Sequence, residues 1–259
     1  MQRSTWAVTE ALTNDDFLGG KVTVWQPRKG YRAGVDPVLL AAATPAKPRQ
    51  SVLELGCGVG VASLCLAARV PDLQLTGVEL QESYATLAQR NFAANAISCD
   101  VITADLQQLP ADLRQQRFDH VIMNPPYFER TKGSAAANAG RDIAMGGDTP
   151  LATWLEVGIR RLAPRGYLTV IQRIERLPEV LAVATGRLGA IKILPIAGRA
   201  TKPPNLFLLQ ARQEGRAPFV LLPAFVMPQG PAHIGAFDSY TPEASAILRD
   251  GAPLAALHT

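Results

Sequence analysis

The residues Asn124, Pro125, Pro126 and Tyr127 follow a short apolar run, 118–123, that predicts a buried strand. Adjacent prolines end strands and asparagine is common in turns, so a structural role is one interpretation. The same residue types can also hold a planar exocyclic amine. The Asn124 oxygen and the rigid Pro125 carbonyl can each accept one amine hydrogen, while the Tyr127 ring can stack on a base. We therefore predict a site that positions a conjugated amine for reaction.

A glycine-rich turn follows an earlier apolar run, 51–55, and predicts a cofactor loop. Its glycines are Gly56, Gly58 and Gly60. Glycines at this place let a ligand approach the backbone and let the next helix begin against the sheet. Glu79 ends the next predicted strand, where doubly wound folds place the acid that binds ribose hydroxyls. The combination predicts a cofactor that carries a nucleoside.

The spacing of the loop favours one kind of cofactor. The turn reads GxGxG, whereas a dinucleotide pyrophosphate usually needs GxGxxG at a helix N-terminus. Glu54 also lies two residues before the first glycine and adds an anionic group to the pocket. An anionic pocket disfavours pyrophosphate and suits a cofactor with a cationic end.

The E-x-G-x-G-x-G pattern of residues 54–60, with Glu79 and Asp105, resembles class I S-adenosylmethionine-dependent methyltransferases. The resemblance implies S-adenosylmethionine as cofactor, with the glycines beside its methionine and ribose. It further implies that Glu79 binds the ribose hydroxyls and Asp105 the adenine amine, with Leu80 and Leu106 next to them. For Asp105, a helix cap is the alternative interpretation.

The Asn-Pro-Pro-Tyr stretch resembles the [D/N]-P-P-[Y/F/W] signature of methyltransferases that act on nitrogens conjugated to a π system. Members of that group methylate adenine in DNA, adenine or guanine amines in RNA, and glutamine side chains in release factors. The resemblance therefore implies the chemistry and leaves the substrate open. The candidate catalytic residues are Asn124, Pro125, Pro126 and Tyr127.

An N-terminal block, QPxxGYRxGxDxxLLAA at 26–42, narrows the substrate. With Asn-Pro-Pro-Tyr and SYTPEA at 239–244, it resembles the bacterial transfer RNA (adenine-N6)-methyltransferases. That family implies N6-methylation of an adenine in RNA, expected to be transfer RNA. It also implies that Arg32 and Asp36 pack over the methionine end of the cofactor. A turn and a helix cap are the alternative roles for these two residues.

The alternation of predicted elements indicates the fold. Strands are expected at 51–55, 73–80, 100–105, 118–124 and 166–172, and helices at 61–70, 82–96 and 150–163. This order predicts a doubly wound, Rossmann-like, seven-stranded and mostly parallel α/β sheet. Strands at 189–197 and 205–212 have a connector too short for a parallel crossover, so they predict an antiparallel hairpin at one edge.

The division of the chain also follows from these elements. Residues 1–50 are expected to form a strand and helix extension that packs on the cofactor pocket. Residues 51–259 are expected to form the methyltransferase domain, within one globular unit.

Positive charge is concentrated after the Asn-Pro-Pro-Tyr stretch, although the whole chain carries only +4. Residues 128–230 contain 14 Lys and Arg against 7 Asp and Glu. This distribution favours an anionic partner such as nucleic acid, with a merely solvated basic surface as the alternative. The candidate RNA contacts are Phe128, Arg130, Lys132, Arg141, Arg199 and Lys202.

Composition excludes several other classes of protein. No apolar run is long enough to span a bilayer, and the N-terminus lacks the apolar core of a signal peptide, so a cytoplasmic location is expected. The three cysteines and three histidines form no metal-site motif, and no metal is expected. The remaining alternatives are a protein glutamine methyltransferase, an rRNA or DNA amino-methyltransferase, and a non-catalytic RNA-binding protein.

Overall fold

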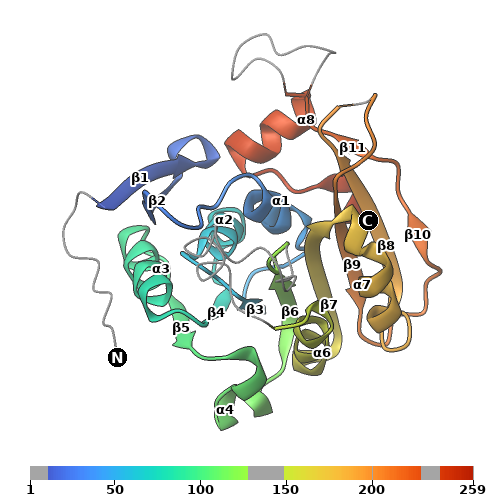
Figure 1. Ribbon diagram of the computed structural model, residues 1–259, viewed down its shortest axis with the longest axis horizontal. Coiled ribbons are helices and arrows are strands. Elements are labelled where there is room, and N and C mark those ends of the chain that lie inside the picture. The colour runs from blue at the N-terminus through green and yellow to red at the C-terminus, as the bar shows by residue number, and fades with distance from the viewer. Residues whose placement is uncertain (1–10, 128–148, 200, 229–239, 259) are drawn as a thin grey trace, which may run out of the picture.

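The computed structural model describes residues 11–127, 149–199, 201–228 and 240–258, and a central β-sheet runs through it (Figure 1). In this part of the chain the sheet has nine strands. Their bounds are β3 (Ser51–Leu55), β4 (Gln74–Glu79), β5 (Cys99–Thr103), β6 (Phe118–Met123), β7 (Leu162–Arg173), β8 (Gly189–Ala197), β9 (Leu206–Arg212), β10 (Val220–Leu221) and β11 (Phe225–Val226). The strand order is β10-β8-β9-β7-β6-β3-β4-β5, and β11 pairs with β8 outside this row.

The directions of the strands confirm the predicted doubly wound sheet. Strands β3 to β7 are mutually parallel, and β9 is antiparallel to both β7 and β8. The prediction of seven strands counts the long ones, since β10 and β11 are two-residue strands that pair with β8. Two residues are too few to show a period in a sequence, so these strands left no signal.

Helices cover both faces of the sheet (Figure 1). On one face lie α1 (Asp36–Ala43), α2 (Val61–Arg69) and α3 (Glu82–Ala94), joined by α8 (Pro242–Ser245) and a π-helical turn (Ala246–Asp250). On the other face lie α4 (Ala111–Gln115), α6 (Leu151–Arg161) and α7 (Leu177–Ala184). Short 3-10 turns occupy Leu18–Gly20, Leu106–Gln108, Ile174–Arg176 and Ala255–Leu257. No helix in the described residues is both long and apolar enough to cross a membrane.

The two hydrophobic cores follow from the alternation of side chains along each strand. In β3, Val52 packs with the first group of helices and Leu53 with the second, and both are fully buried. Strands that are buried on both faces read as continuous apolar runs, which is the pattern of 51–55 and 118–123. Two helical layers are therefore needed to cover the sheet.

The order of the strands reverses between β3 and β6. From β3 the chain continues outward to β4 and β5, then returns to place β6 on the other side of β3. Open α/β sheets bind ligands at the carboxyl ends of the strands at such a switch point. Leu55 and Met123 pair at these carboxyl ends, so the glycine turn and Asn124 begin side by side.

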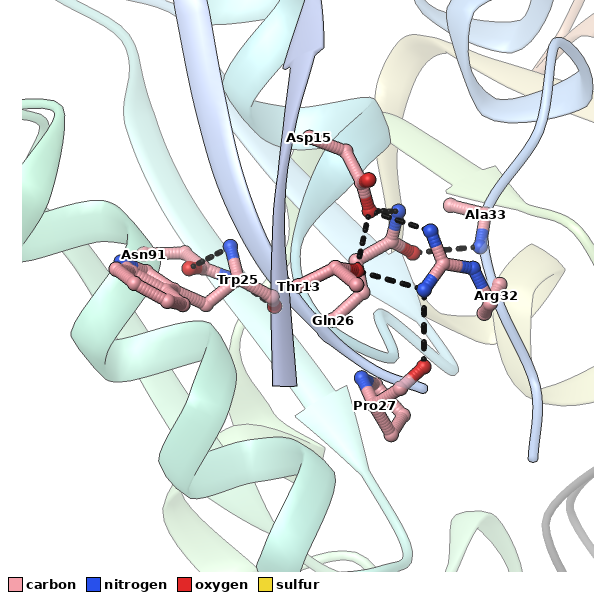
Figure 2. A network of polar contacts seen from close by, with 8 residues as sticks. All are labelled: Thr13, Asp15, Trp25, Gln26, Pro27, Arg32, Ala33 and Asn91. Atoms are coloured by element: carbon pink, nitrogen blue, oxygen red, sulfur yellow. Dashed lines mark hydrogen bonds and ion pairs between the residues drawn. The ribbon is translucent and has the colours of Figure 1, made fainter. Parts of the chain in front are cut away.

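A separate N-terminal hairpin, β1 (Leu12–Phe17) and β2 (Val22–Pro27), lies against α3 (Figure 1). The Asn91 carboxamide of α3 accepts from the backbone N–H of Trp25 at 2.8 Å, as Figure 2 shows, and donates to the Trp25 carbonyl at 3.1 Å. Asn95 makes the same pair of bonds with Thr23, at 3.0 and 2.7 Å. Four helical residues rise about 6 Å and two strand residues about 6.7 Å, so the two asparagines match alternate residues of β2.

We expect the Asn91→Ala variant to be less stable than the wild type by about 2–4 kcal/mol, measured by urea unfolding. Asn91 is fully buried and also donates to the Val59 carbonyl at 3.0 Å, so its loss leaves several buried backbone groups unpaired. Asn14→Ala, at an exposed position of β1, is the control and should change the free energy of unfolding by less than about 0.5 kcal/mol. Equal effects of the two substitutions would contradict this account of docking.

Candidate functional site

A pocket opens at the carboxyl ends of β3, β4 and β6. Its cavity volume is about 670 Å³, open solvent at the mouth included. The lining residues are Tyr31, Ala33, Pro37, Glu54, Gly56, Cys57, Gly58, Val59, Val61, Ala62, Glu79, Gln81, Tyr84, Asn124, Pro126 and Trp154. The structure thus brings two glycines of the turn, the acids Glu54 and Glu79, and Asn124 and Pro126 to one cavity, although about 70 residues of sequence separate Glu54 from Asn124.

Two of the three glycines are required by close packing as well as by backbone conformation. Gly56 has φ +67°, and a Cβ there would lie 2.5 Å from the Trp154 ring of α6. Gly60 has φ +90° at the start of α2, and a Cβ would lie 2.9 Å from the Phe92 ring of α3. Gly60 does not line the pocket, so its part is to let the loop and α3 pack together.

Glu79 closes the glycine loop from the next strand. One carboxylate oxygen accepts from the Gly58 N–H at 2.9 Å, and the other accepts from the Gln81 N–H at 2.9 Å. The side chain is only 7% exposed, and burial raises the pKa of its carboxyl against the lowering effect of these bonds. A carboxylate has about four acceptor positions, so Glu79 can still accept a hydrogen bond from a diol.

Glu54 is buried below the glycine loop. Its Oε2 atom accepts from the Ser63 hydroxyl at 2.5 Å and from the Ser63 backbone N–H at 3.1 Å. Burial raises the pKa of the Glu54 carboxyl to about 7, and the nearby Glu79 carboxylate adds to the rise. Two acids in one largely enclosed cavity make it a favourable site for a cation.

A second hollow of about 320 Å³ adjoins the first and shares Gly56, Glu79 and Trp154 with it. It is lined by Gly56, Val78, Glu79, Leu80, Ala104, Asp105, Leu106, Thr149 and Trp154. The predicted residues Leu80, Asp105 and Leu106 therefore lie together. Asp105 also caps the 3-10 turn at 106–108, because its Oδ1 atom accepts from the Gln107 N–H at 2.8 Å. Capping uses one oxygen, so the two interpretations of Asp105 are compatible.

The four residues of the Asn-Pro-Pro-Tyr stretch have different surroundings. Asn124 and Pro126 line the pocket, whereas the Pro125 carbonyl accepts from the buried Gln172 amide of β7 at 3.2 Å. The Tyr127 hydroxyl donates to the Asp36 carboxylate at 2.5 Å. Burial and the Asp36 charge raise the pKa of Tyr127, which keeps the hydroxyl protonated and donating. The first residue of α1 thereby holds the ring of the last residue of the stretch.

Arg32 lies in a polar network with the hairpin and does not line the pocket (Figure 2). Its guanidinium forms an ion pair with Asp15 at 2.7 Å and donates to the Thr13 hydroxyl at 2.6 Å. Gln26 extends the network by donating to Asp15 at 2.9 Å and accepting from the Ala33 N–H at 2.8 Å. These bonds tie the hairpin to the loop that supplies Tyr31 and Ala33 to the pocket.

Sequence reasoning did not identify three aromatic residues of the pocket wall. Trp154 lies in the predicted helix 150–163, but its contact with Gly56 depends on how that helix packs. The Tyr84 hydroxyl accepts from the Tyr31 N–H at 3.1 Å, and this bond spans 53 residues of sequence. The only available signal was the position of Tyr31 within the GYR block.

The predicted RNA contacts are only partly described. Phe128, Arg130, Lys132 and Arg141 lie outside the described residues. Arg199 and Lys202 lie in the connector between β8 and β9. This connector is on the side of the sheet where the parallel strands have their carboxyl ends, as the pocket is, and Lys202 is exposed. The described residues contain no group of three His, Cys, Asp or Glu side chains that could hold a metal ion.

Comparison of sequences finds relatives over most of the chain. The family model described as "Methyltransferase small domain" matches residues 33–152. Curated proteins named tRNA1(Val) (adenine(37)-N6)-methyltransferase are similar to it. The Porphyromonas gingivalis protein is 31% identical over 211 residues, covering 78% of this chain and 82% of that protein. The Tolumonas auensis protein is 30% identical over 189 residues, covering 71% and 77%.

Comparison of structures finds the same fold in methyltransferases. A predicted O-methyltransferase from Agrobacterium tumefaciens superposes with a TM-score of 0.69 at 23% identity, covering 84% of this chain and 97% of that one. The T. thermophilus 16S rRNA N2 G1207 methyltransferase, solved with AdoMet and guanosine, superposes with a TM-score of 0.55 at 20% identity, covering 78% and 50%. These likenesses establish the fold.

The raised pKa of Glu54 predicts how stability depends on pH. Between the ordinary pKa of 4.5 and about 7, the folded protein holds a proton at Glu54 that the unfolded chain releases. Stability from this group is therefore lost as pH rises through that range. We expect the free energy of unfolding of Glu54→Gln, relative to wild type, to rise by up to about 3 kcal/mol from pH 4.5 to 8. The exposed Glu82→Gln is the control, and a pH-independent difference for Glu54→Gln would contradict the prediction.

Proposed function

Since the chain belongs to the family whose curated members are named tRNA1(Val) (adenine(37)-N6)-methyltransferase, we propose that it methylates the N6 amine of an adenine in transfer RNA. The observation that carries the proposal is the placement of Asn124 in the wall of the pocket that also contains Glu54 and Glu79. One cavity then contains both an acceptor for the amine and the acids that suit a cationic methyl donor. A cytoplasmic location, where transfer RNA is handled, is part of the same proposal.

The pocket residues fit S-adenosylmethionine, which supplies an electrophilic methyl group on a sulfonium. Glu79 can accept a further hydrogen bond from the ribose diol, and the Asp105 oxygen not used in capping can accept from an adenine amine. Glu54 and Glu79 together favour the positive charge of the donor. The glycine loop gives close access to the backbone between them.

Asn124 and Pro125 then act on the acceptor amine. The lone pair of an exocyclic amine is delocalised into the ring, which makes the nitrogen a weak nucleophile. When the Asn124 oxygen and the Pro125 carbonyl accept its two hydrogens, the nitrogen is drawn toward tetrahedral geometry with its lone pair directed at the methyl carbon. S-adenosylmethionine would supply the methyl group, its carbon–sulfur bond breaking as the nitrogen–carbon bond forms, and the methylated nitrogen would then lose a proton to solvent. Tyr127, fixed by Asp36, stacks on the base.

Cationic side chains at the carboxyl ends of the strands, where the pocket lies, can bind the phosphates of an RNA backbone. Arg173 ends β7 beside Gln172, and its side chain is 37% exposed and pairs with Glu175 at 3.6 Å. Arg199 and Lys202 follow β8 in the neighbouring connector. Lysine and arginine at such positions bind phosphate without reading the sequence. A target base must be unstacked to reach the pocket, which a single-stranded loop of transfer RNA permits.

Methyl transfer from labelled S-adenosylmethionine into unmodified valine transfer RNA tests the function. We expect wild-type protein to form N6-methyladenosine and Asn124→Ala to reduce kcat by roughly 10²-fold or more, because one of two amine acceptors is lost. Asn124→Asp retains an acceptor oxygen and should keep more activity than the alanine variant. Label that enters protein, or RNA that stays unlabelled with cofactor bound, would refute the proposed substrate.

Charge reversal tests the RNA surface. We expect Lys202→Glu and Arg199→Glu each to raise KM for transfer RNA several-fold, to lessen its dependence on salt, and to leave KM for S-adenosylmethionine unchanged. Arg216→Glu is the matched control. This exposed arginine follows β9, whose end lies at the amino ends of the parallel strands and so on the side away from the pocket. If all three variants bind RNA alike, the β8–β9 connector is not part of the RNA surface.

A further inference from the structure

Gln172 is a buried polar side chain that contacts the Asn-Pro-Pro-Tyr stretch from the neighbouring strand. It is 0% exposed near the end of β7, directly after the buried residues Val170 and Ile171. Its Nε2 atom donates to the Pro125 carbonyl at 3.2 Å, and its Oε1 atom accepts from the Arg173 backbone N–H at 2.8 Å. Burying an amide is costly unless it is hydrogen-bonded, and here both ends of the carboxamide are engaged.

The Gln172 carboxamide replaces a backbone hydrogen bond that β6 and β7 do not form. Strands β6 and β7 pair in parallel up to Met123 and Val170. The amide of Ile174 bonds to the β9 side of β7, so the amide before it, of Arg173, points to the β6 side. Continued pairing would give the Arg173 N–H the Pro125 carbonyl as its direct acceptor. The strands part at this point instead, and the glutamine side chain bridges the two groups.

This bridge determines where the Pro125 carbonyl points. A carbonyl oxygen has two lone pairs, and Gln172 occupies one of them from the side of β7. The Pro125 ring fixes φ and the following Pro126 restricts ψ to the extended region, so the C=O bond has a narrow range of directions, within which the Gln172 bond selects one. Asn124 on one side lines the pocket, as does Pro126 on the other. Pro125 itself does not line the pocket, but its carbonyl lies between these two lining residues and keeps a second lone pair that Gln172 does not use.

We propose that Gln172 is a positioning residue for methyl transfer, because its carboxamide directs the free lone pair of the Pro125 carbonyl toward the substrate amine. This role rests on the proposed amine methylation. Gln172 itself touches neither the amine nor the methyl donor. Its effect falls on the rate of the bound complex and leaves the binding of cofactor and RNA unchanged.

Gln172→Met tests the role, with Gln210→Met as its matched control. Gln210 is also a buried glutamine of the same sheet and donates to a backbone carbonyl, that of Ala43, at 3.0 Å. Each substitution removes one buried amide group and leaves a side chain of similar size. We expect Gln172→Met to lower kcat at least tenfold with both KM values within about twofold of wild type, since misplacing a reacting group slows the step. Gln210→Met should lose comparable thermal stability and keep kcat within twofold.

Gln172→Glu adds a readout that a purely structural role does not move. The introduced carboxylate can accept from the Arg173 N–H but cannot donate to Pro125, whereas the protonated acid can do both. Burial raises the pKa of such a carboxyl toward the assay range. We expect the kcat of this variant, divided by that of wild type at the same pH, to rise at least about fivefold from pH 8.5 to 6. The same ratio for Gln172→Met should stay flat.

The outcomes separate the two proposals. If wild-type protein methylates adenine in RNA and Gln172→Met keeps the same kcat as Gln210→Met, the role of Gln172 is refuted and the function stands. A Gln172→Glu ratio that does not change with pH also refutes it. If wild-type protein with bound S-adenosylmethionine transfers no methyl group to RNA, the proposed function fails and the role of Gln172 fails with it.

Discussion

The site depends on the parallel pairing of β3 with β6, which holds in register as far as Leu55 and Met123 and then ends. Glycine follows one strand and Asn-Pro-Pro follows the other, so neither can continue the pairing. The cavity is the space left where the two strands part. It is therefore held by deeply buried strands, and the core positions the residues that line it.

The pocket is maintained at a cost in stability. Glu54 and Glu79 are both buried, and burial raises the pKa of each carboxyl. Backbone amides and Ser63 compensate part of that cost through hydrogen bonds. A cation between the two carboxyls offsets part of the remaining cost, so the pair favours the binding of a positively charged donor.

The N-terminal segment is attached in two physically different ways. α1 belongs to the hydrophobic core, and Leu39 and Leu40 are fully buried there. The hairpin also buries Val22 and Val24 in this core, and directional polar bonds add to its attachment. These bonds come from Asn91 of α3, from its C-cap Asn95 and from the Arg32–Asp15 pair. Since α1 carries Asp36, which holds Tyr127, the segment before the sheet contributes to the geometry of the Asn-Pro-Pro-Tyr stretch.

The sequence by itself determined the long strands of the sheet and the residue types of the loops, because these are local. Apolar runs defined β3 within its observed bounds, and the glycines and acids singled out by their spacing include four residues that line one pocket. The tertiary structure alone decided the partners that come from distant segments. Trp154 packs on Gly56, Arg32 pairs with Asp15 away from the pocket, and Gln172 holds Pro125. No periodicity or motif encodes such contacts, since they depend on how strands and helices are juxtaposed after they form.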